Sequence, residues 1–336
     1  MPNFRGVLRG IRFAVPGVSM RRLVRVFLTA AAVLLPAVLF CRKCGAPSGV
    51  SRSDLPAFYR IYRTETGTVE NVPVRDYLIG TVGAEMPASY LPEALKAQTV
   101  AAHSYAEYVR RQRIQHPEPS LHGAALSDDC ARDQAFIPPE QLRRTLGEHG
   151  YAAIAAAVDA AGDMLLLYDN APAAAVYHAC SAGRTESAAV LWGNAVPYLV
   201  QVDSPADRNA PQYAGTVTLS ADELRERLTG EDIVLPDDPA AWLSVQETSE
   251  SGTVLRARCG SAELTGMRLR NLLGLRSACF TVTFADGIFT FRTRGFGHGA
   301  GMSQYGANAL AAQGCDAAEI LQYYYPGTAL TAQKPG

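Results

Sequence analysis

The stretch VRDYLIGTVGAEMPASYLPEALKAQTVAAHSYAEYVRRQ, residues 74–112, predicts two helices joined by a short loop. Apolar residues recur at helical spacing up to Glu85, and Pro87 disfavours a helical residue before it, so the first helix should end near Glu85. Pro92 suits the first position of the second helix, and Glu93 complements the helix dipole there. Glu85, the one carboxylate in AEMPASY at residues 84–90, is therefore expected among apolar neighbours at a helix C-terminus.

Strands and hairpins are expected on both sides of this helical pair. Residues 58–63 read as a strand, and two segments predict hairpins that turn at Asp169-Asn170 and at Asp286-Gly287. Short helices are expected at residues 139–146, after the capping box of Ser220 and Glu223, and at residues 306–314 and 316–327. Helices and hairpins segregate without regular βαβ alternation. The sequence therefore predicts an α+β fold, a single domain with mostly antiparallel sheet.

The bulk composition is that of a globular protein without a strong charge. Of the 336 residues, 48% are hydrophobic and 19% are charged, and the formal net charge is −1. A chain of this composition is not disordered, and a net charge near zero gives no attraction for nucleic-acid phosphates. We therefore expect no nucleic-acid partner.

An apolar run near the N-terminus departs from this globular pattern. It covers residues 26–40 and follows three arginines within residues 21–25. The run is short for a full span but suits a signal sequence, and we expect an uncleaved signal-anchor helix over residues 23–41. A buried core helix fits less well because nothing nearby would cover it, and Phe40 stands where a lipoprotein site at Cys41 needs a small residue. The bulk of the chain is then expected outside the cell membrane, attached by a single span.

These observations divide the chain into five parts. A linker rich in Gly, Ser and Pro separates the anchor from the folded part. The expected parts are a basic segment at 1–22, the anchor at 23–41, the linker at 42–56, the folded domain at 57–330 and a tail at 331–336.

A glycine-rich stretch, RGFGHGAGMSQYGANALAAQG, occupies residues 294–314. It fits neither the G-x-G-x-x-G register nor a Gly-Lys-Ser/Thr ending, so we do not expect a phosphate-binding loop. The glycines let the backbone pass very close to another group, either a ligand or the protein core. Four side chains on this loop suit a sugar or peptide ligand: His298, Ser303, Gln304 and Tyr305.

A second polar stretch, YHACSAGRTESAAVLWG, occupies residues 177–193. Ser181 and Arg184 crowd an expected turn there and are candidates for substrate binding. His178 reads equally well as a partnered histidine at a strand end. Serine and histidine together invite a hydrolase triad, but no G-x-S-x-G elbow is present. A hydrolase with Ser181 or Cys180 as nucleophile is therefore the weakest of the open alternatives.

Four motifs, taken together and in order, resemble the stage II sporulation protein D family, also called the SpoIID/LytB domain, from about residue 58 to 330. They are VRDYLIGTVGAEMPASYLPEALKAQTVAAHSYA, YHACSAGRTESAAVLWG, LTGMRLRNLLGLRSACFTV and RGFGHGAGMSQYGANALAAQG. The resemblance implies a membrane-anchored or secreted lytic transglycosylase that acts on peptidoglycan glycan strands, preferably denuded ones, during engulfment in sporulation. One group of relatives is described as amidase enhancers, which implies a cell-wall amidase as partner.

The resemblance assigns catalysis to the Glu of the family's EMP motif, which is Glu85 in this sequence. Hydrolysing glycosidases usually need two carboxylates, but a lytic transglycosylase uses no water and needs one acid/base. It cuts between N-acetylmuramic acid and N-acetylglucosamine and leaves a 1,6-anhydro end. A helix C-terminus and apolar neighbours would raise the pKa of Glu85, as this chemistry requires.

The sequence departs from the family pattern at His103, where many members carry Arg. Lys96 and His103 lie two turns apart on one helix face and are candidates for substrate binding. A neutral histidine would bind an anionic lactyl group less well than arginine. The main alternative is therefore a non-catalytic module that binds glycan and stimulates a partner amidase.

The cysteines leave the metal and redox state open. Some relatives bind zinc through a Cys…His-Cys cluster, and the matching positions here hold Ser127, Arg132 and Asp133. We expect that site to be lost, and no cofactor. Cys130, His178 and Cys180 offer a weaker zinc alternative. Disulfides from Cys130 to Cys180 or from Cys259 to Cys279, or free thiols, are the other options.

Overall fold

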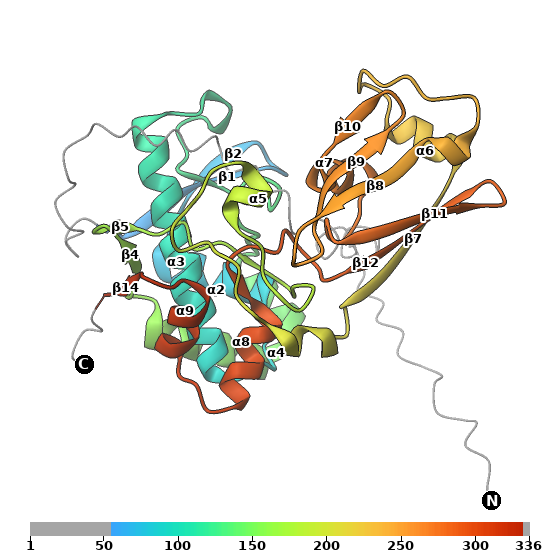
Figure 1. The fold of residues 1–336 in the computed structure, drawn as a ribbon. Helices are drawn as coiled ribbons and strands as arrows, with labels where there is room; N and C mark the ends of the chain where they lie inside the picture. The colour runs from blue at the N-terminus through green and yellow to red at the C-terminus, as the bar shows by residue number, and fades with distance from the viewer. Residues whose placement is uncertain (1–54, 332–336) are drawn as a thin grey trace, which may run out of the picture.

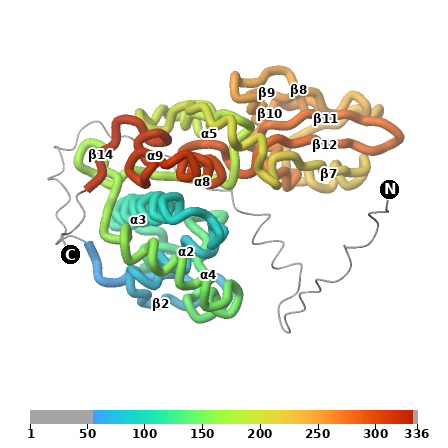
Figure 2. The backbone as a smooth tube through the Cα atoms, turned by 90° about the horizontal axis from the view of Figure 1, so that it is seen from below, coloured from blue at the N-terminus to red at the C-terminus, as the bar shows by residue number. Residues whose placement is uncertain are grey.

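The computed structural model describes residues 55–331, an α+β arrangement with eight α-helices and mostly antiparallel sheets (Figure 1). Two large hydrophobic cores are present, one built from residues 59–199 and 300–325, the other from residues 219–291. We call the parts around them the helical lobe (55–213 and 295–331) and the strand-rich lobe (214–294); they lie side by side in Figures 1 and 2. The α+β prediction is confirmed, but the prediction of a single domain did not resolve these two lobes.

The helical lobe is organised around α3, a helix of 24 residues that contacts α2, α4, α8 and α9. Ala94, Ala97 and Ala101 are fully buried on it, and their small side chains let the neighbouring helices approach closely. The elements of this lobe are β1 (Phe58–Arg63), β2 (Thr68–Pro73), α2 (Val74–Glu85), α3 (Pro92–Gln115), η2 (Pro119–Leu121), β3 (Leu126–Ser127), α4 (Pro139–Ala161), β4 (Leu166–Tyr168), β5 (Ala171–Pro172), β6 (Tyr177–His178), α5 (Ala188–Trp192), η3 (Pro205–Asn209), β13 (Met302–Ser303), α8 (Gln304–Ala312), α9 (Ala317–Tyr324) and β14 (Ala329–Leu330).

The strand-rich lobe is inserted between η3 and β13. Its sheets have the orders β10-β9-β8 and β11-β12-β7, all antiparallel. Its elements are β7 (Ala214–Ser220), α6 (Ala221–Arg227), η4 (Pro239–Ala241), β8 (Leu243–Thr248), β9 (Val254–Cys259), β10 (Ala262–Leu264), α7 (Gly266–Leu273), β11 (Phe280–Ala285) and β12 (Ile288–Arg294). The chain therefore leaves the helical lobe once and returns at the glycine-rich loop.

Local sequence signals set several element boundaries as predicted. Helix α2 ends at Glu85 and α3 begins at Pro92. Ser220 and Glu223 form the complete capping box of α6. The Asp286-Gly287 turn joins β11 to β12, and both residues have positive φ angles of 50° and 77°. These predictions are confirmed because each depends on residues close together in the chain.

The predicted helix at residues 139–146 is too short, because α4 extends to Ala161. Gly147, with φ of 70° and ψ of 172°, interrupts the helix where the prediction ended it. The run after the break becomes helical again because Ile154 and Val158 bury their side chains in the first hydrophobic core.

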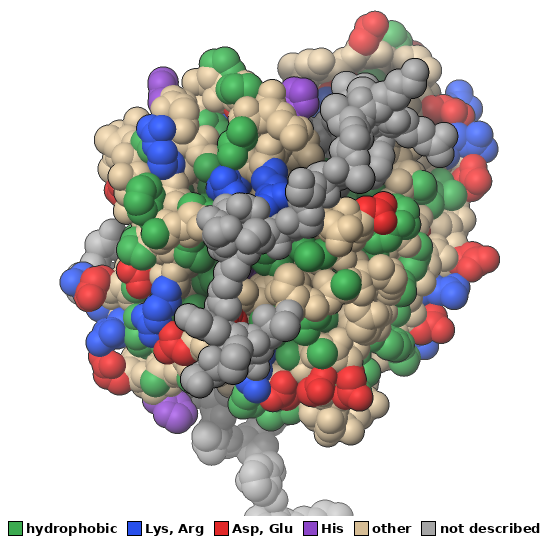
Figure 3. Space-filling model, turned by 90° about the vertical axis from the view of Figure 1, so that its left-hand side faces the viewer, with side chains coloured by type: hydrophobic (Ala, Val, Ile, Leu, Met, Phe, Trp, Pro, Cys, Tyr) green, Lys and Arg blue, Asp and Glu red, His purple; other side chains and the backbone are tan. Residues whose placement is uncertain are grey.

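Part of the predicted domain plan lies outside the described residues. This applies to the basic N-terminal segment, the signal-anchor, nearly all of the linker and nearly all of the tail. Within residues 55–331 no helix is long and apolar enough to cross a membrane. On the face in Figure 3, acidic and basic side chains both occur among hydrophobic ones, as the near-zero net charge predicts for a mixed surface.

Candidate active site

Glu85 is the last residue of α2, and its carboxyl group meets a coil segment that comes from far along the chain. The backbone N–H of Ala135 donates a hydrogen bond of 3.1 Å to Glu85 Oε1. The residue keeps part of its surface accessible, yet burial raises the pKa of Glu85 to about 7, and the Ala135 N–H and the side chain of Gln304 oppose that rise. Near neutral pH this group can therefore both give and take a proton.

Gln134 connects the surroundings of Glu85 into one network. Its Nε2 donates to Tyr77 Oη at 2.9 Å and to the carbonyl of Ala102 at 3.2 Å, and its Oε1 accepts from Tyr177 Oη at 2.6 Å. Burial raises the pKa of both tyrosines, and the negative charge of Glu85 adds to the rise. Both hydroxyl groups therefore stay neutral where Glu85 titrates. Sequence reasoning missed Gln134 and Tyr177, which carry no local signal of this role.

The glycine-rich loop reaches the site through a short parallel pairing of β6 with β13. Met302 lies opposite Tyr177, and Ser303 lies opposite His178. Gly297 has φ of 114°, and a Cβ built there would lie 2.6 Å from His178 Cβ. Position 297 therefore needs a glycine because the backbone packs closely against β6. Of the two roles that the sequence left open for the loop glycines, this one is packing against the protein core.

Gln304 is the predicted binding residue that the structure brings to Glu85. It begins α8, is 5% exposed, and affects the pKa of Glu85 from nearby. Its Nε2 has no hydrogen-bond partner at normal distance among the described residues. A buried donor without a partner is costly, so this amide is available to a ligand at the site.

Ser303 and Ser181 are both bound to Asp207, a fully buried carboxylate that the sequence did not single out. Ser303 Oγ donates to Asp207 Oδ1 at 2.7 Å and accepts from the Gly306 N–H at 3.0 Å. The Ser181 N–H donates to Asp207 Oδ2 at 2.7 Å, and Ser181 Oγ accepts from the Gly183 N–H at 3.1 Å. These contacts tie the two predicted motifs together.

Two other residues of the glycine-rich loop, His298 and Tyr305, contact neighbouring segments. The His298 ring lies 5.5 Å from that of Trp192 and 5.7 Å from that of His178. Burial, His178 and Arg270 hold the pKa of His298 well below its ordinary value, so the ring is neutral. Tyr305 Oη donates to the carbonyl of Asn209 at 3.3 Å.

Of the remaining predicted binding residues, Lys96 and Arg184 form ion pairs and His103 is buried. Lys96 Nζ lies 2.7 Å from Glu93 Oε1. His103 is 2% exposed, and burial lowers its pKa, so it is neutral. Arg184 lies 3.1 Å from Asp203 and 2.9 Å from Glu250. None of these ion pairs includes Glu85, and the substrate-binding roles of the three residues stay predictions.

Neither disulfide suggested by the sequence is formed, since Cys180, Cys259 and Cys279 carry free thiols. Burial raises the pKa of Cys180 to about 12, which makes it a poor nucleophile at neutral pH. From residue 55 to residue 331, no three His, Cys, Asp or Glu side chains are grouped as metal ligands. The zinc alternative at Cys130, His178 and Cys180 therefore has no ligand cluster to support it.

These features define a class: an α+β protein in which a carboxyl group of raised pKa, that of Glu85, lies at the end of α2 near Tyr177 of β6 and Gln304 of α8. A family described as stage II sporulation protein matches residues 62–168. Stage II sporulation protein D of Bacillus subtilis is 36% identical over 279 residues, which cover 82% of this chain and 79% of that protein. The Bacillus amyloliquefaciens protein of the same name is 35% identical over 281 residues, covering 82% of this chain and 78% of that protein.

The chain therefore belongs to the stage II sporulation protein D family. It is also similar to the amidase enhancer of Bacillus subtilis, with 29% identity over 76% of this chain and 40% of that longer protein. These matches support a role related to sporulation and the cell wall.

Proposed function

We propose that this protein is a lytic transglycosylase that cleaves peptidoglycan glycan strands with Glu85 as its single acid/base. The observation that carries the proposal is the carboxyl group of Glu85, whose pKa burial raises to about 7. Its protonated and ionised forms are then both abundant near neutral pH, as a group that acts first as acid and then as base requires.

The reaction needs only this one carboxyl group. Protonated Glu85 gives its proton to the glycosidic oxygen between N-acetylmuramic acid and N-acetylglucosamine, and the C1–O bond breaks. The C6 hydroxyl oxygen of the muramic residue bonds to C1, and ionised Glu85 takes the hydroxyl proton. The products are a free 4-hydroxyl end and a 1,6-anhydro ring, and Glu85 is protonated again.

The surroundings of Glu85 support this use of one acid. No other carboxyl group in residues 55–331 is among the causes of its pKa shift, which are burial, Ala135 and Gln304. Enzymes that hydrolyse glycosides pair two carboxyl groups instead. The side chain of Gln304 lowers the pKa of Glu85, and its Nε2 has no hydrogen-bond partner at normal distance among the described residues, so it can also donate to a sugar hydroxyl or acetamido oxygen.

A second candidate is a glycan-binding module that stimulates a partner amidase. His103 is buried and neutral, so it supplies no cation for an anionic lactyl group. The similarity to an amidase enhancer favours a relationship with a cell-wall amidase in either case.

We also propose that residues 23–41 hold the chain in the cell membrane as a single span, with the lobes on the extracytoplasmic side. The basis is the sequence pattern of arginines followed by an apolar run. This location would place Glu85 beside its polymeric substrate.

The test incubates the full-length chain, in mild detergent, with peptide-free glycan strands, and detects 1,6-anhydromuramic ends by mass spectrometry. Glu85→Gln is the test variant, and Glu148→Gln, at a side chain 77% exposed, is the matched control. Anhydro ends from the wild type and the control but not from Glu85→Gln support the transglycosylase. If all three proteins bind glycan and none produces anhydro ends, the transglycosylase proposal is refuted and the glycan-binding module is supported instead.

A further inference from the structure

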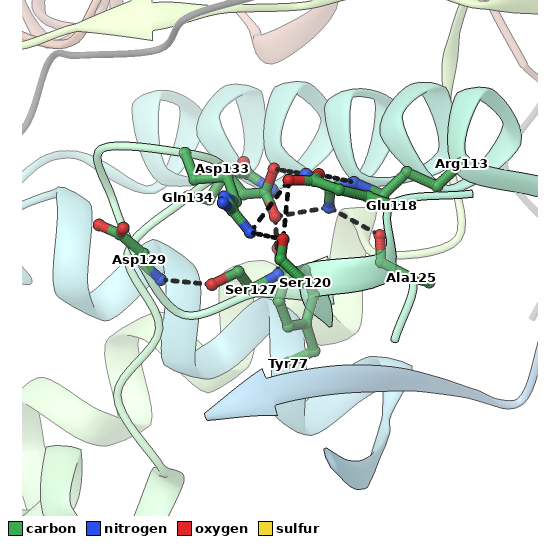
Figure 4. A network of polar contacts seen from close by, with 10 residues as sticks. Tyr77, Arg113, Glu118, Ser120, Ala125, Ser127, Asp129, Asp133 and Gln134 are labelled. Carbon is green, nitrogen blue, oxygen red and sulfur yellow. Dashed lines mark hydrogen bonds and ion pairs between the residues drawn. The ribbon is translucent and has the colours of Figure 1, made fainter. Parts of the chain in front are cut away.

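A buried ion pair lies beside the segment that contacts Glu85 (Figure 4). We propose that Arg113 and Asp133 are positioning residues for Glu85, because their pair fixes the coil segment 133–136 whose Ala135 N–H meets the carboxyl group. The inference rests on the proposed function of Glu85, but the pair itself touches no reacting atom.

The pair is bidentate and almost excluded from water. Arg113 Nη1 and Nη2 each lie 2.7 Å from one oxygen of Asp133, and the side chains are 12% and 1% exposed. The Ser127 N–H adds a third donor to Asp133 at 2.6 Å, and Arg113 also donates to the carbonyl of Ala125 at 2.9 Å. A planar guanidinium that meets both oxygens fixes the orientation of the carboxylate, which a single contact would not do.

The fixed carboxylate of Asp133 helps to position Ala135, two residues later, which contacts Glu85. The segment is neither helix nor strand. Backbone hydrogen bonds hold its ends, from the Asp133 N–H to the Asp129 carbonyl at 2.9 Å and from the Ile137 N–H to the Gly80 carbonyl at 3.4 Å, and side-chain contacts position the residues between them. Asp133 holds one end, Gln134 binds Tyr77 and Tyr177, and the ring of Phe136 stacks on Tyr77 at 5.7 Å. The Ala135 N–H lies between these anchors and points at Glu85 Oε1.

Several charged and titratable groups surround the pair. Glu118 lies 3.5 Å from Arg113 Nε and 3.2 Å from Arg132 Nη1. The charge of Arg132 lowers the pKa of Asp133, and the charge of Asp133 raises the pKa of Tyr105. Tyr77 and Tyr177 are the titratable groups that sense Glu85. Asp133 is not among the causes of the Glu85 shift, so its charge acts on Glu85 only weakly.

A change of charge at Asp133 and a displacement of the segment should shift the pKa of Glu85 in different directions. Removal of the negative charge of Asp133, with the segment unmoved, would lower the pKa of Glu85 or leave it unchanged. Displacement of the Ala135 N–H would raise the pKa, because a donor to the ionised form is lost. An upward shift after neutralisation of Asp133 therefore reports the position of the segment.

The experiment measures the titration of Glu85 by carbon-13 NMR in the full-length chain labelled at glutamate, with the Glu85→Gln spectrum as assignment. The variants are Asp133→Asn and Arg113→Lys, which keeps the cation but not the planar fork. Asp159→Asn is the control, because Arg75 and Asp159 form an exposed bidentate pair at 2.6 and 2.9 Å. Formation of anhydro ends is followed against pH with the same proteins.

We expect the Glu85 titration to move to higher pH in Asp133→Asn and less far in Arg113→Lys, with no movement in Asp159→Asn. The rate at pH 6 should fall about tenfold or more in Asp133→Asn because the acid is misplaced. An unchanged or lowered midpoint in folded Asp133→Asn overturns the inference, and Arg113→Lys decides in the same way if Asp133→Asn does not fold. A wild type without anhydro ends refutes the proposed function alone, since the titration still tests the position of the segment.

Discussion

Tyr177 Oη donates a hydrogen bond of 2.6 Å to Gln134 Oε1 across 43 positions of the chain. This bond joins β6 to the segment 133–136, one residue beyond the Arg113–Asp133 pair. Gln134 is 3% exposed, so its oxygen has no ready replacement partner. The site around Glu85 is therefore held by polar contacts between distant parts of the sequence.

Tyr177→Phe should lower the free energy of unfolding by about 1–3 kcal/mol, because it leaves a buried amide oxygen without its donor. The measurement is urea denaturation at pH 7. Tyr323→Phe is the control: its hydroxyl donates to the Asp203 carbonyl at 2.7 Å, but the residue is 41% exposed, so water can replace it. Equal losses in the two variants would contradict the account of Gln134.

Glu85→Gln should stabilise the fold at pH 8 and lose this advantage as the pH falls. The pKa of Glu85 in the folded state, about 7, lies above the usual value of 4.5. Between pH 4.5 and pH 7 the folded state therefore binds more protons than the unfolded state, and the stability of the wild type falls as the pH rises through this window. At 1.36 kcal/mol per pKa unit, reduced because Glu85 is partly accessible to water, the gain at pH 8 is about 1–3 kcal/mol.

Urea denaturation of both proteins at pH 5 and pH 8 checks this prediction. The difference between Glu85→Gln and the wild type should be small at pH 5 and largest at pH 8. A constant difference at both values would mean that Glu85 titrates normally in the folded protein.

Glu186 should show the opposite pH dependence. This residue lies in the helical lobe, and its Oε2 accepts from Ser249 Oγ at 2.6 Å and from Ser251 Oγ, both in the strand-rich lobe. Burial alone would raise the pKa of Glu186, but hydrogen bonds from the two serines, the Ser187 N–H and Gln201 lower it overall. The carboxylate thus joins the two lobes.

Glu186→Gln should lower the free energy of unfolding by about 1–3 kcal/mol at pH 7, since charge-assisted hydrogen bonds are lost. The wild-type advantage is present above the usual value of 4.5 and should shrink as the pH falls through the lowered folded pKa. Urea denaturation at pH 7 and pH 4 measures it, and an advantage that grows toward pH 4 would refute the assignment.

The sequence predicted what depends on neighbours in the chain. The ends of α2 and α3 follow from Pro87 and Pro92, which restrict the backbone locally. Glu85 itself was identified by resemblance to a family motif. The hydrogen bond from Ala135 was not predictable, because the donor lies in a coil 50 positions away that meets Glu85 only in the folded chain. Asp207 was missed for the same reason, since its partners Ser181 and Ser303 meet it only in the folded chain.

Gly306→Ala should destabilise the protein, although the same substitution at an exposed helical position normally stabilises one. Replacing an exposed helical glycine by alanine normally stabilises a protein by about 1 kcal/mol. In α8, however, a Cβ at Gly306 would overlap Tyr324 Oη and Ser204 Oγ, which form a hydrogen bond of 2.8 Å with each other. Gly306→Ala should therefore lower the free energy of unfolding by about 1–3 kcal/mol through overpacking.

A double-mutant cycle with Tyr324→Phe separates this overlap from the general effect of alanine on the helix. Tyr324→Phe removes the hydroxyl that the new methyl group would meet, so the loss caused by Gly306→Ala should be smaller in that background by about 1 kcal/mol. Urea denaturation of the four proteins gives the coupling. Strict additivity would show that the backbone shifts to accept the methyl group and that contact with Tyr324 does not restrict position 306.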